Sequence, residues 1–314
     1  MNLNEANSHQ AYSMLIDEHT VTIKSLYFLI VNYNSSSLVA RLIDSININS
    51  QDRYQIVIVN NSAADREIYN LENNFTKIIE AKGNLGFGRA CNLGLNWIKD
   101  QDRAAIIWLI NPDAYFNSDE TNPKLTNTEI AIAFFQNHPQ ISILGTIVND
   151  SQGEITSAGG ICNVATGALS IITSLPEKSK VDFLKTDWVS GCSLLINLAN
   201  FAQCPNFDPG YFLYYEDLDF CLRYGQQGHQ IAITPLITIN HDTSSISDRN
   251  LQKKYQYITQ SYLIHLEKYS NLPIFIFTNL RMSLNTIRLI LFKPQQGIGK
   301  LIGIYNYWRS RLIK

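Results

Sequence analysis

Short, continuous apolar runs that alternate with helical patterns are the feature that most constrains the fold of this chain. In the first helical pattern, one apolar face is formed by Leu38, Leu42, Ile43 and Ile46. The strand-like runs have no polar interruption, as strands buried on both faces require. Repeated strand and helix patterns of this kind predict a parallel α/β sheet of the nucleotide-binding type. The four strand-like runs are LYFLIVNY (26–33), YQIVIV (54–59), KIIEA (77–81) and AAIIWLI (104–110).

Polar residues follow the predicted strands at their carboxyl ends, where such sheets bind ligands. Asn34, Asn60, Asn84 and Asp113 occupy these positions. The alternation breaks down after this point, and the Asn/Thr/Asp-rich stretch 117–128 is expected to form a surface loop. Later strand-like segments are separated by glycine-bearing turns, which favours mixed or antiparallel additions to the sheet. These segments are 141–148, 188–196 and 230–239.

Composition and cysteine usage indicate a folded intracellular protein. The chain has 314 residues, 45% of them hydrophobic and 17% charged, which suits one large α/β domain with an appendage. Its five cysteines are odd in number and form no CxxC pair, so a reducing cytoplasm is expected. The first 24 residues are polar and lack the pattern of a signal peptide, and we interpret them as an N-terminal extension.

Charge is distributed unevenly along the chain. Residues 249–314 carry eleven Lys or Arg against one acid, a net charge of +10, whereas the preceding residues carry −12. Basic segments bind nucleic acid or anionic membranes, and the apolar content of this one favours membrane over nucleic acid. Residues 274–292 approach membrane-spanning length but contain Arg281 and Arg288, which favours a helix lying in the membrane interface. The alternative is a helix packed on the protein with its arginines outward.

A glycine-rich segment, GNLGFGRA (83–90), follows the third predicted strand. Its spacing of Gly83, Gly86 and Gly88 is not the GxGxxG of dinucleotide-binding proteins, and no acidic residue ends a strand about 20 residues later. The segment predicts either a close approach of the backbone to a phosphate or sugar, or a plain tight turn.

Two isolated polar motifs offer ligands for a metal ion. NPDA (111–114) places Asp113 just past a buried strand, and a divalent cation that bridges two phosphates needs few protein carboxylates. His241 follows the strand-like run PLITIN in the same way. The alternatives are an ordinary turn at Asp113 and a histidine without a metal role.

The segment YFLYYEDLDFCLR (211–223) places three carboxylates directly behind a run of aromatic residues. One interpretation is the first turn of a helix, where the dipole favours acids and Asp219 pairs with Arg223 on the surface. The other is a catalytic base at the floor of a pocket. The segment alone does not distinguish them.

The order of these motifs resembles that of family 2 glycosyltransferases of the GT-A fold, in particular the rhamnosyltransferase-like bacterial group. The resemblance covers residues 26–247 and rests on seven motifs in one order. They are IVNYN, VNNS, NLGFGRACNLG, LINPDA, WVSGCSLLI, FDPGYFLYYEDLDFCLRYGQQG and INHDTSS.

The resemblance implies roles for individual residues. NPDA corresponds to the family's DxD motif, so Asp113, helped by His241, would hold Mg²⁺ or Mn²⁺, and Asp217 would be the general base. Val59 departs from the pattern, since many relatives carry Asp there. The implied acceptor-binding residues are Trp188, Gly191, Tyr215 and Glu216. The implied donor-binding residues are Tyr33, Asn34, Asn60, Asn84, Gly86, Phe87 and Asp113.

The resemblance therefore implies a metal-dependent, inverting glycosyltransferase with a mostly parallel sheet and a helical C-terminal extension. A dTDP- or UDP-linked donor would deliver rhamnose or another hexose to a cell-surface glycan or its lipid-linked precursor. The alternative is a non-catalytic nucleotide-sugar-binding scaffold of the same fold. The expected divisions are an extension (1–24), a catalytic domain (25–247) and a basic helical region (248–314). We expect the protein in the cytoplasm, peripheral at the inner face of the membrane.

Overall fold

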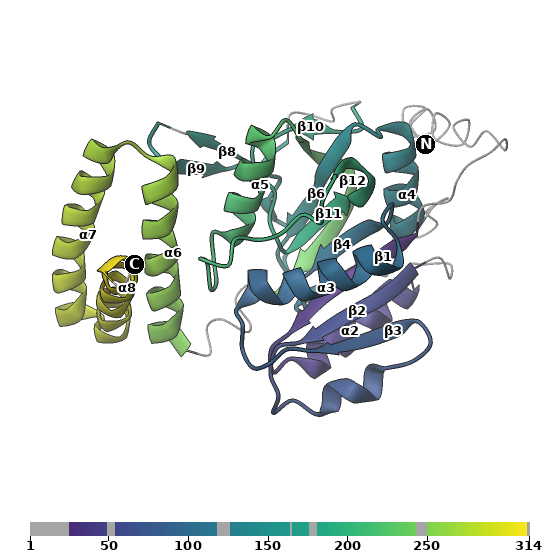
Figure 1. Ribbon diagram of the computed structural model, residues 1–314, viewed down its shortest axis with the longest axis horizontal. Coiled ribbons are helices and arrows are strands. Elements are labelled where there is room, and N and C mark those ends of the chain that lie inside the picture. The colour runs from purple at the N-terminus through teal and green to yellow at the C-terminus, as the bar shows by residue number, and fades with distance from the viewer. Residues whose placement is uncertain are drawn as a thin grey trace.

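A computed structural model describes residues 25–48, 54–117, 126–163, 165–175, 181–242 and 250–312, so the N-terminal extension lies outside the described residues. Its centre is a ten-stranded mixed sheet with helices on both faces, and three C-terminal helices stand beside it (Figure 1). The principal strand order is β10-β12-β6-β11-β4-β1-β2-β3. This architecture confirms the predicted α/β class.

The first half of the sheet is parallel, as the apolar runs predict. It contains β1 (Leu26–Asn32), β2 (Tyr54–Asn60), β3 (Thr76–Glu80) and β4 (Ile106–Ile110). The helices α2 (Ser36–Ile48) and α3 (Phe87–Gln101) contribute to two separate buried cores, one on each face of the sheet. Between β2 and β3 the chain forms only a short 3₁₀ helix, η1 (Glu67–Leu71), where the alternating pattern predicts an α-helix.

The second half of the sheet is mixed, which confirms the expected departure from the alternating pattern. Strand β11 (Ser193–Asn197) runs antiparallel between β4 and β6 (Ile141–Asn149), and β12 (Gln230–His241) runs parallel to β6. The loop predicted over 117–128 lies mostly outside the described residues. The remaining elements are β5 (Ala114–Tyr115), α4 (Asn127–Asn137), β7 (Ile155–Ser157), β8 (Gly160–Asn163), β9 (Ala168–Ile171), β10 (Leu184–Lys185) and η2 (Leu198–Asn200).

Four helices complete the chain: α5 (Glu216–Gln226), α6 (Leu251–Tyr269), α7 (Leu272–Phe292) and α8 (Pro294–Leu312). Capping side chains explain two of the starts. Asn250 accepts a hydrogen bond from the amide of Lys253, and Asn271 accepts one from the amide of Ile274. Helix α6 stands against the sheet domain, and α7 is the outermost helix of the three-helix group (Figure 1).

Candidate active site

Two adjoining cavities open at the carboxyl ends of the parallel strands. The larger has a volume of about 570 Å³ and the smaller about 450 Å³. Both are lined by Phe87, Asn111, Leu213, Tyr214 and His241, so the two spaces meet at these side chains. A pair of adjoining cavities can bring two substrates together at one point.

The larger cavity contains most of the predicted donor-binding residues. The exception is Asn60, whose buried side chain accepts a hydrogen bond from Asn32 and donates one to Glu80. Its neighbour Asn61 lines the cavity instead, and donates to the side-chain oxygen of Asn84 at 3.2 Å. The predicted residues that line the cavity are Tyr33, Asn34, Asn84, Gly86, Phe87 and Asp113.

The glycine-rich segment forms part of the wall between the cavities. Gly86 has a φ of +83°, and a Cβ at this position would lie 2.2 Å from the carbonyl oxygen of Phe212. The next amide, that of Phe87, donates a hydrogen bond of 2.9 Å to the same oxygen. The close approach predicted for this segment is therefore an approach to the chain's own backbone, which fixes the aromatic segment before α5.

Helix α6 supplies a side of the larger cavity that sequence patterns did not indicate. Lys253, Lys254 and Tyr257 line it, with Asn250 at the helix start. The ring of Tyr257 lies 4.6 Å from that of Phe212. In the sequence these lysines belong to a long basic region. Only the tertiary fold brings them to the cavity.

Asp113 and His241 are brought together by the antiparallel pairing of β5 with β12, in which His241 lies opposite Ala114. Nε2 of His241 lies 3.0 Å from Oδ1 of Asp113. Burial opposes protonation of His241, but hydrogen bonds with Asp113 and Cys192 outweigh it and raise its pKa to about 10.

The pair offers one carboxylate and one imidazole to a cation, and binding of the cation would displace the proton that His241 otherwise holds. Within the described ranges, no group of three or more His, Cys, Asp or Glu side chains is arranged to hold a metal ion. The two protein ligands, Asp113 and His241, therefore suit a cation that takes its remaining ligands from phosphate oxygens and water.

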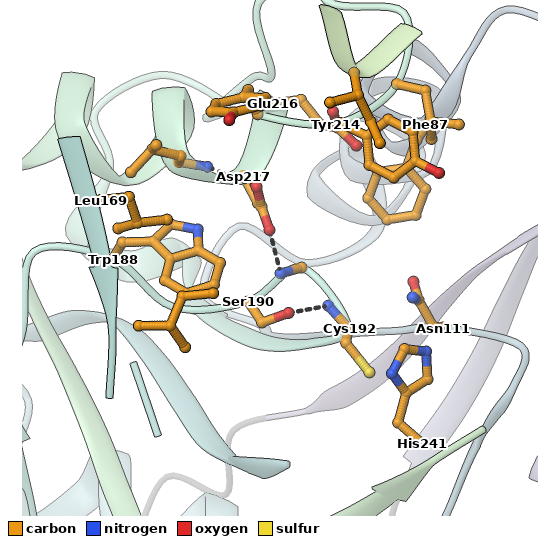
Figure 2. A pocket seen from close by; sticks show the side chains of 16 residues that line it. Phe87, Asn111, Leu169, Trp188, Ser190, Cys192, Tyr214, Glu216, Asp217 and His241 are labelled. Carbon is orange, nitrogen blue, oxygen red and sulfur yellow. Dashed lines mark hydrogen bonds between the residues drawn. The ribbon is translucent and has the colours of Figure 1, made fainter. Parts of the chain in front are cut away.

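Asp217 points into the smaller cavity from the first turn of α5 (Figure 2). Its Oδ2 accepts a hydrogen bond of 2.9 Å from the amide of Gly191, and Oδ1 accepts one of 2.8 Å from Leu218. Burial raises the pKa of Asp217, while these amide hydrogen bonds act in the opposite direction. Tyr214 and Tyr215 both have positive φ, 68° and 66°, and this turn aims the helix start at the cavity.

Glu216 lies beside Asp217 and lines the same cavity, but its carboxyl group is almost completely buried. One of its oxygens, Oε2, has no hydrogen-bond partner among the described residues. Burial and the nearby charge of Asp217 raise the pKa of Glu216 to about 8. A neutral Glu216 at pH 7 can donate a hydrogen bond, whereas an ionised Asp217 can accept a proton.

Apolar side chains wall the smaller cavity. Trp188 lies on one side of Asp217, and Phe87 and Tyr214 lie on the other (Figure 2). Leu169 and Ile171 of β9 extend the wall, and Ser190 and Cys192 also line the cavity. The predicted residues Trp188, Gly191, Tyr215, Glu216 and Asp217 are thus brought to one space.

The interpretation of Asp219 as an exposed partner of Arg223 is wrong. Asp219 is 0% exposed and accepts hydrogen bonds from Arg223 at 2.6 Å, from Lys268 at 2.8 Å and from the hydroxyl of Tyr269 at 3.0 Å. Helix spacing predicted the first of these partners. The other two come from α6, which sequence spacing alone did not place there.

The mixed sheet with helices on both of its faces is the GT-A fold. One solved structure with this fold, GalNAc-T7 with UDP, GalNAc and Mn²⁺, matches with a TM-score of 0.55 at 14% identity, over 71% of this chain and 44% of that one. Residues 27–154 match the model of glycosyl transferase family 2. This stretch of the chain is therefore similar to the catalytic domain of that family.

Similarity to characterised proteins extends beyond the matched domain. The rhamnosyltransferase WbbL of Escherichia coli (strain K12) is 21% identical over 253 residues, which span 76% of this chain and 94% of that protein. The N-acetylglucosaminyl-diphospho-decaprenol L-rhamnosyltransferase of Mycobacterium tuberculosis (strain CDC 1551 / Oshkosh) is 20% identical over 249 residues, 70% of this chain and 76% of that protein. These similarities confirm the resemblance to rhamnosyltransferase-like family members.

Proposed function

We propose that this glycosyltransferase moves a sugar from a nucleotide donor to an acceptor hydroxyl, with inversion at the anomeric carbon and with the help of a divalent cation. The observation that carries the proposal is the position of Asp217. Its carboxylate points into the smaller cavity, which meets the Asp113–His241 pair at the shared residue His241. One base therefore faces one site for the leaving group.

The larger cavity suits the nucleotide. Tyr33 and Phe212 offer ring surfaces, Asn34 and Asn61 offer amide groups, and two lysines of α6 offer positive charge. A nucleoside diphosphate needs all three kinds of contact, because it combines a flat base, a hydroxylated sugar and an anionic diphosphate.

The smaller cavity suits the acceptor sugar, whose apolar faces stack well on aromatic side chains. A sugar hydroxyl is a weak nucleophile, so Asp217 would take its proton as the oxygen attacks the anomeric carbon. Burial favours this role by making the Asp217 carboxylate more basic. A single displacement from the side opposite the nucleotide inverts the configuration at that carbon.

A cation held by Asp113 and His241 would stabilise the negative charge that develops on the departing diphosphate. The lysines of α6 line the same cavity and would add to this stabilisation. Both effects would act on the leaving group, whereas Asp217 acts on the acceptor.

Similarity to two rhamnosyltransferases supports rhamnose as the transferred sugar. We propose a dTDP- or UDP-linked donor for it. The name of the mycobacterial relative describes a lipid-linked acceptor, which supports a lipid-linked precursor of a cell-surface glycan here. A panel of nucleotide sugars, screened for thermal stabilisation of the protein with Mn²⁺ present, would identify the donor.

Replacing Asp217 with Asn tests the catalytic assignment. The amide keeps the shape of the side chain but cannot take a proton, so we expect transfer to fall by a factor on the order of 10² to 10⁴. Affinity for the nucleoside diphosphate should stay unchanged, because Asp217 does not line the larger cavity. Transfer at the original rate by the Asp217→Asn protein would refute the assignment, and absence of transfer by the original protein on every donor would favour a non-catalytic scaffold.

Replacing Asp113 with Ala tests the cation. Calorimetric titration of a nucleoside diphosphate should show tighter binding with Mn²⁺ or Mg²⁺ than without, and Asp113→Ala should abolish the difference along with activity. Asp44→Ala is a suitable control, since Asp44 is exposed on α2 and lines neither cavity. Equal affinity of the original protein with and without cation would exclude this role.

A further inference from the structure

The outer face of α7 is an apolar surface that the described fold leaves uncovered. Eight of its aliphatic and aromatic side chains are each between 50 and 76% exposed, and the seven that precede the terminal Phe292 share one side of the helix. Successive helix residues are rotated by about 100°, so all seven lie within an arc of about 140° on one side of the helix. The buried residues Thr278 and Thr286 lie on the opposite side. The seven are Leu272, Ile276, Phe277, Leu280, Leu284, Ile287 and Leu291.

Helix α8 presents a second apolar stripe. Its members recur at intervals of three and four residues, which places them on one side of the helix. They are Ile298, Leu301, Tyr305, Trp308 and Leu312. Soluble monomers rarely expose contiguous apolar patches of this kind, and such patches mark surfaces that bind a partner or a membrane.

Charge on these helices has one sign. Residues 270–312 contain six Lys or Arg and no Asp or Glu. Arg281 and Arg288 border the apolar arc of α7, where they can reach lipid phosphates while the arc enters the acyl region. The same positive charge disfavours a second copy as the partner, because a two-fold interface would place like charges opposite each other.

We propose that α7 and α8 dock the protein on an anionic phospholipid bilayer, with α7 lying in the plane of the interface. Among the described residues, α7 is the one helix long and apolar enough to cross a membrane by length and composition. Its inner side, however, packs on α8, where Phe275 contacts the rings of Tyr307 and Trp308. A helix surrounded by lipid would not keep one side on a soluble partner or carry two arginines mid-length.

This docking is tied to the catalytic body through α6. Gly299 and Gly303 of α8 let the two helices touch, since a Cβ at these positions would lie 2.3 and 2.5 Å from carbonyl oxygens of α6. Helix α6 in turn lines both cavities, through Tyr257 and Ile258. The bilayer surface would therefore hold the cavities at a fixed distance and orientation from the lipid.

Vesicle binding of the full chain tests this proposal independently of sugar transfer. The double variant Phe277→Ser, Leu284→Ser should bind mixed phosphatidylcholine and phosphatidylglycerol vesicles at least about tenfold more weakly than the original protein. Phe75→Ser is a matched control, because Phe75 is 60% exposed on the catalytic body and Phe277 is 65% exposed. Vesicle binding by the Phe75→Ser variant should not change. Unchanged circular dichroism and melting temperature would show that the variants are folded.

Two further measurements fix the mode of binding. The double variant Arg281→Gln, Arg288→Gln should bind anionic vesicles about fivefold more weakly for each charge removed. Its binding to vesicles of pure phosphatidylcholine should change little. Brominated lipids should quench Trp308, and alkaline carbonate should release the protein. The proposal is overturned if the Phe277, Leu284 variant binds vesicles as the original does, if only detergent releases the protein, or if the apolar face instead mediates a dimer that does not bind vesicles.

Discussion

Asp219 illustrates how one buried carboxylate can join separate parts of the chain. Its three hydrogen-bond donors come from α5 and α6, and two of them are cationic. Asp219→Asn would remove the buried counter-charge of Arg223 and leave Lys268 paired with Asp208 alone. We expect the free energy of unfolding to fall by about 3 kcal/mol, far more than the few tenths that a surface helix pair contributes. Urea denaturation measures this change.

Asp208 provides the matched control for Asp219. It also pairs with Lys268, but its side chain is partly exposed. Asp208→Asn should lower the free energy of unfolding by less than about 1 kcal/mol. Equal losses for the two variants would contradict a special role of burial at Asp219.

The raised pKa of Glu216 should make the stability of the protein depend on pH. Its pKa of about 8 lies above the usual value of 4.5, so the folded protein keeps a proton that the unfolded chain releases between these values. The contribution of Glu216 to stability is thus fully present below pH 4.5 and is lost as pH rises to about 8. Glu216→Gln removes this titration. The variant should gain stability relative to the original protein by about 1 kcal/mol per pH unit between pH 5 and 8, and the gain should level off above pH 8.

Urea denaturation at a series of pH values gives this difference directly. The slope is the informative quantity, because it does not depend on how well the glutamine side chain packs. A difference that does not vary with pH would show that Glu216 titrates in the folded protein as it does in the unfolded chain.

At the scale of elements, α6 contributes charge to the larger cavity. Replacing both Lys253 and Lys254 with Ala should weaken binding of a nucleoside diphosphate about 10- to 100-fold, because charge-assisted hydrogen bonds are worth about 1.5 to 3 kcal/mol. Binding of the uncharged nucleoside should change little. Calorimetry with both ligands measures the contrast, and Lys185→Ala on the exposed edge strand β10 is the control. Equal weakening for nucleoside and diphosphate would place the lysines at the base or sugar instead.

The elements that sequence patterns predicted are those with local signals. Buried strands require unbroken apolar runs, so β1, β2 and β4 were predictable from the sequence. The aromatic and acidic segment 211–223 also predicted the start of a helix and the wall of a cavity. Asn60 and Asn61 are adjacent and chemically identical, and only the direction of the strand at its end decides which one faces the cavity.

At the scale of the whole molecule, contacts between distant segments were beyond prediction from spacing. Lys268 meets Asp219 across 49 residues and Asp113 meets His241 across 128. The order of the motifs suggested the contact between Asp113 and His241, but only through the resemblance to a family. The contact of α6 with both cavities had no local signal at all, because helical periodicity shows which residues share a face but not what that face covers.

The position of α6 limits how this protein can be divided. A fragment that ended near residue 247 would match the boundary suggested by the motifs, yet it would lack the lysines and Tyr257 of the larger cavity and Ile258 of the smaller one. It would also uncover Asp219 and remove its partners Lys268 and Tyr269. Truncation to improve solubility would thus dismantle both cavities. Recombination with the C-terminal helices of another transferase would have to exchange α5 and α6 as one module.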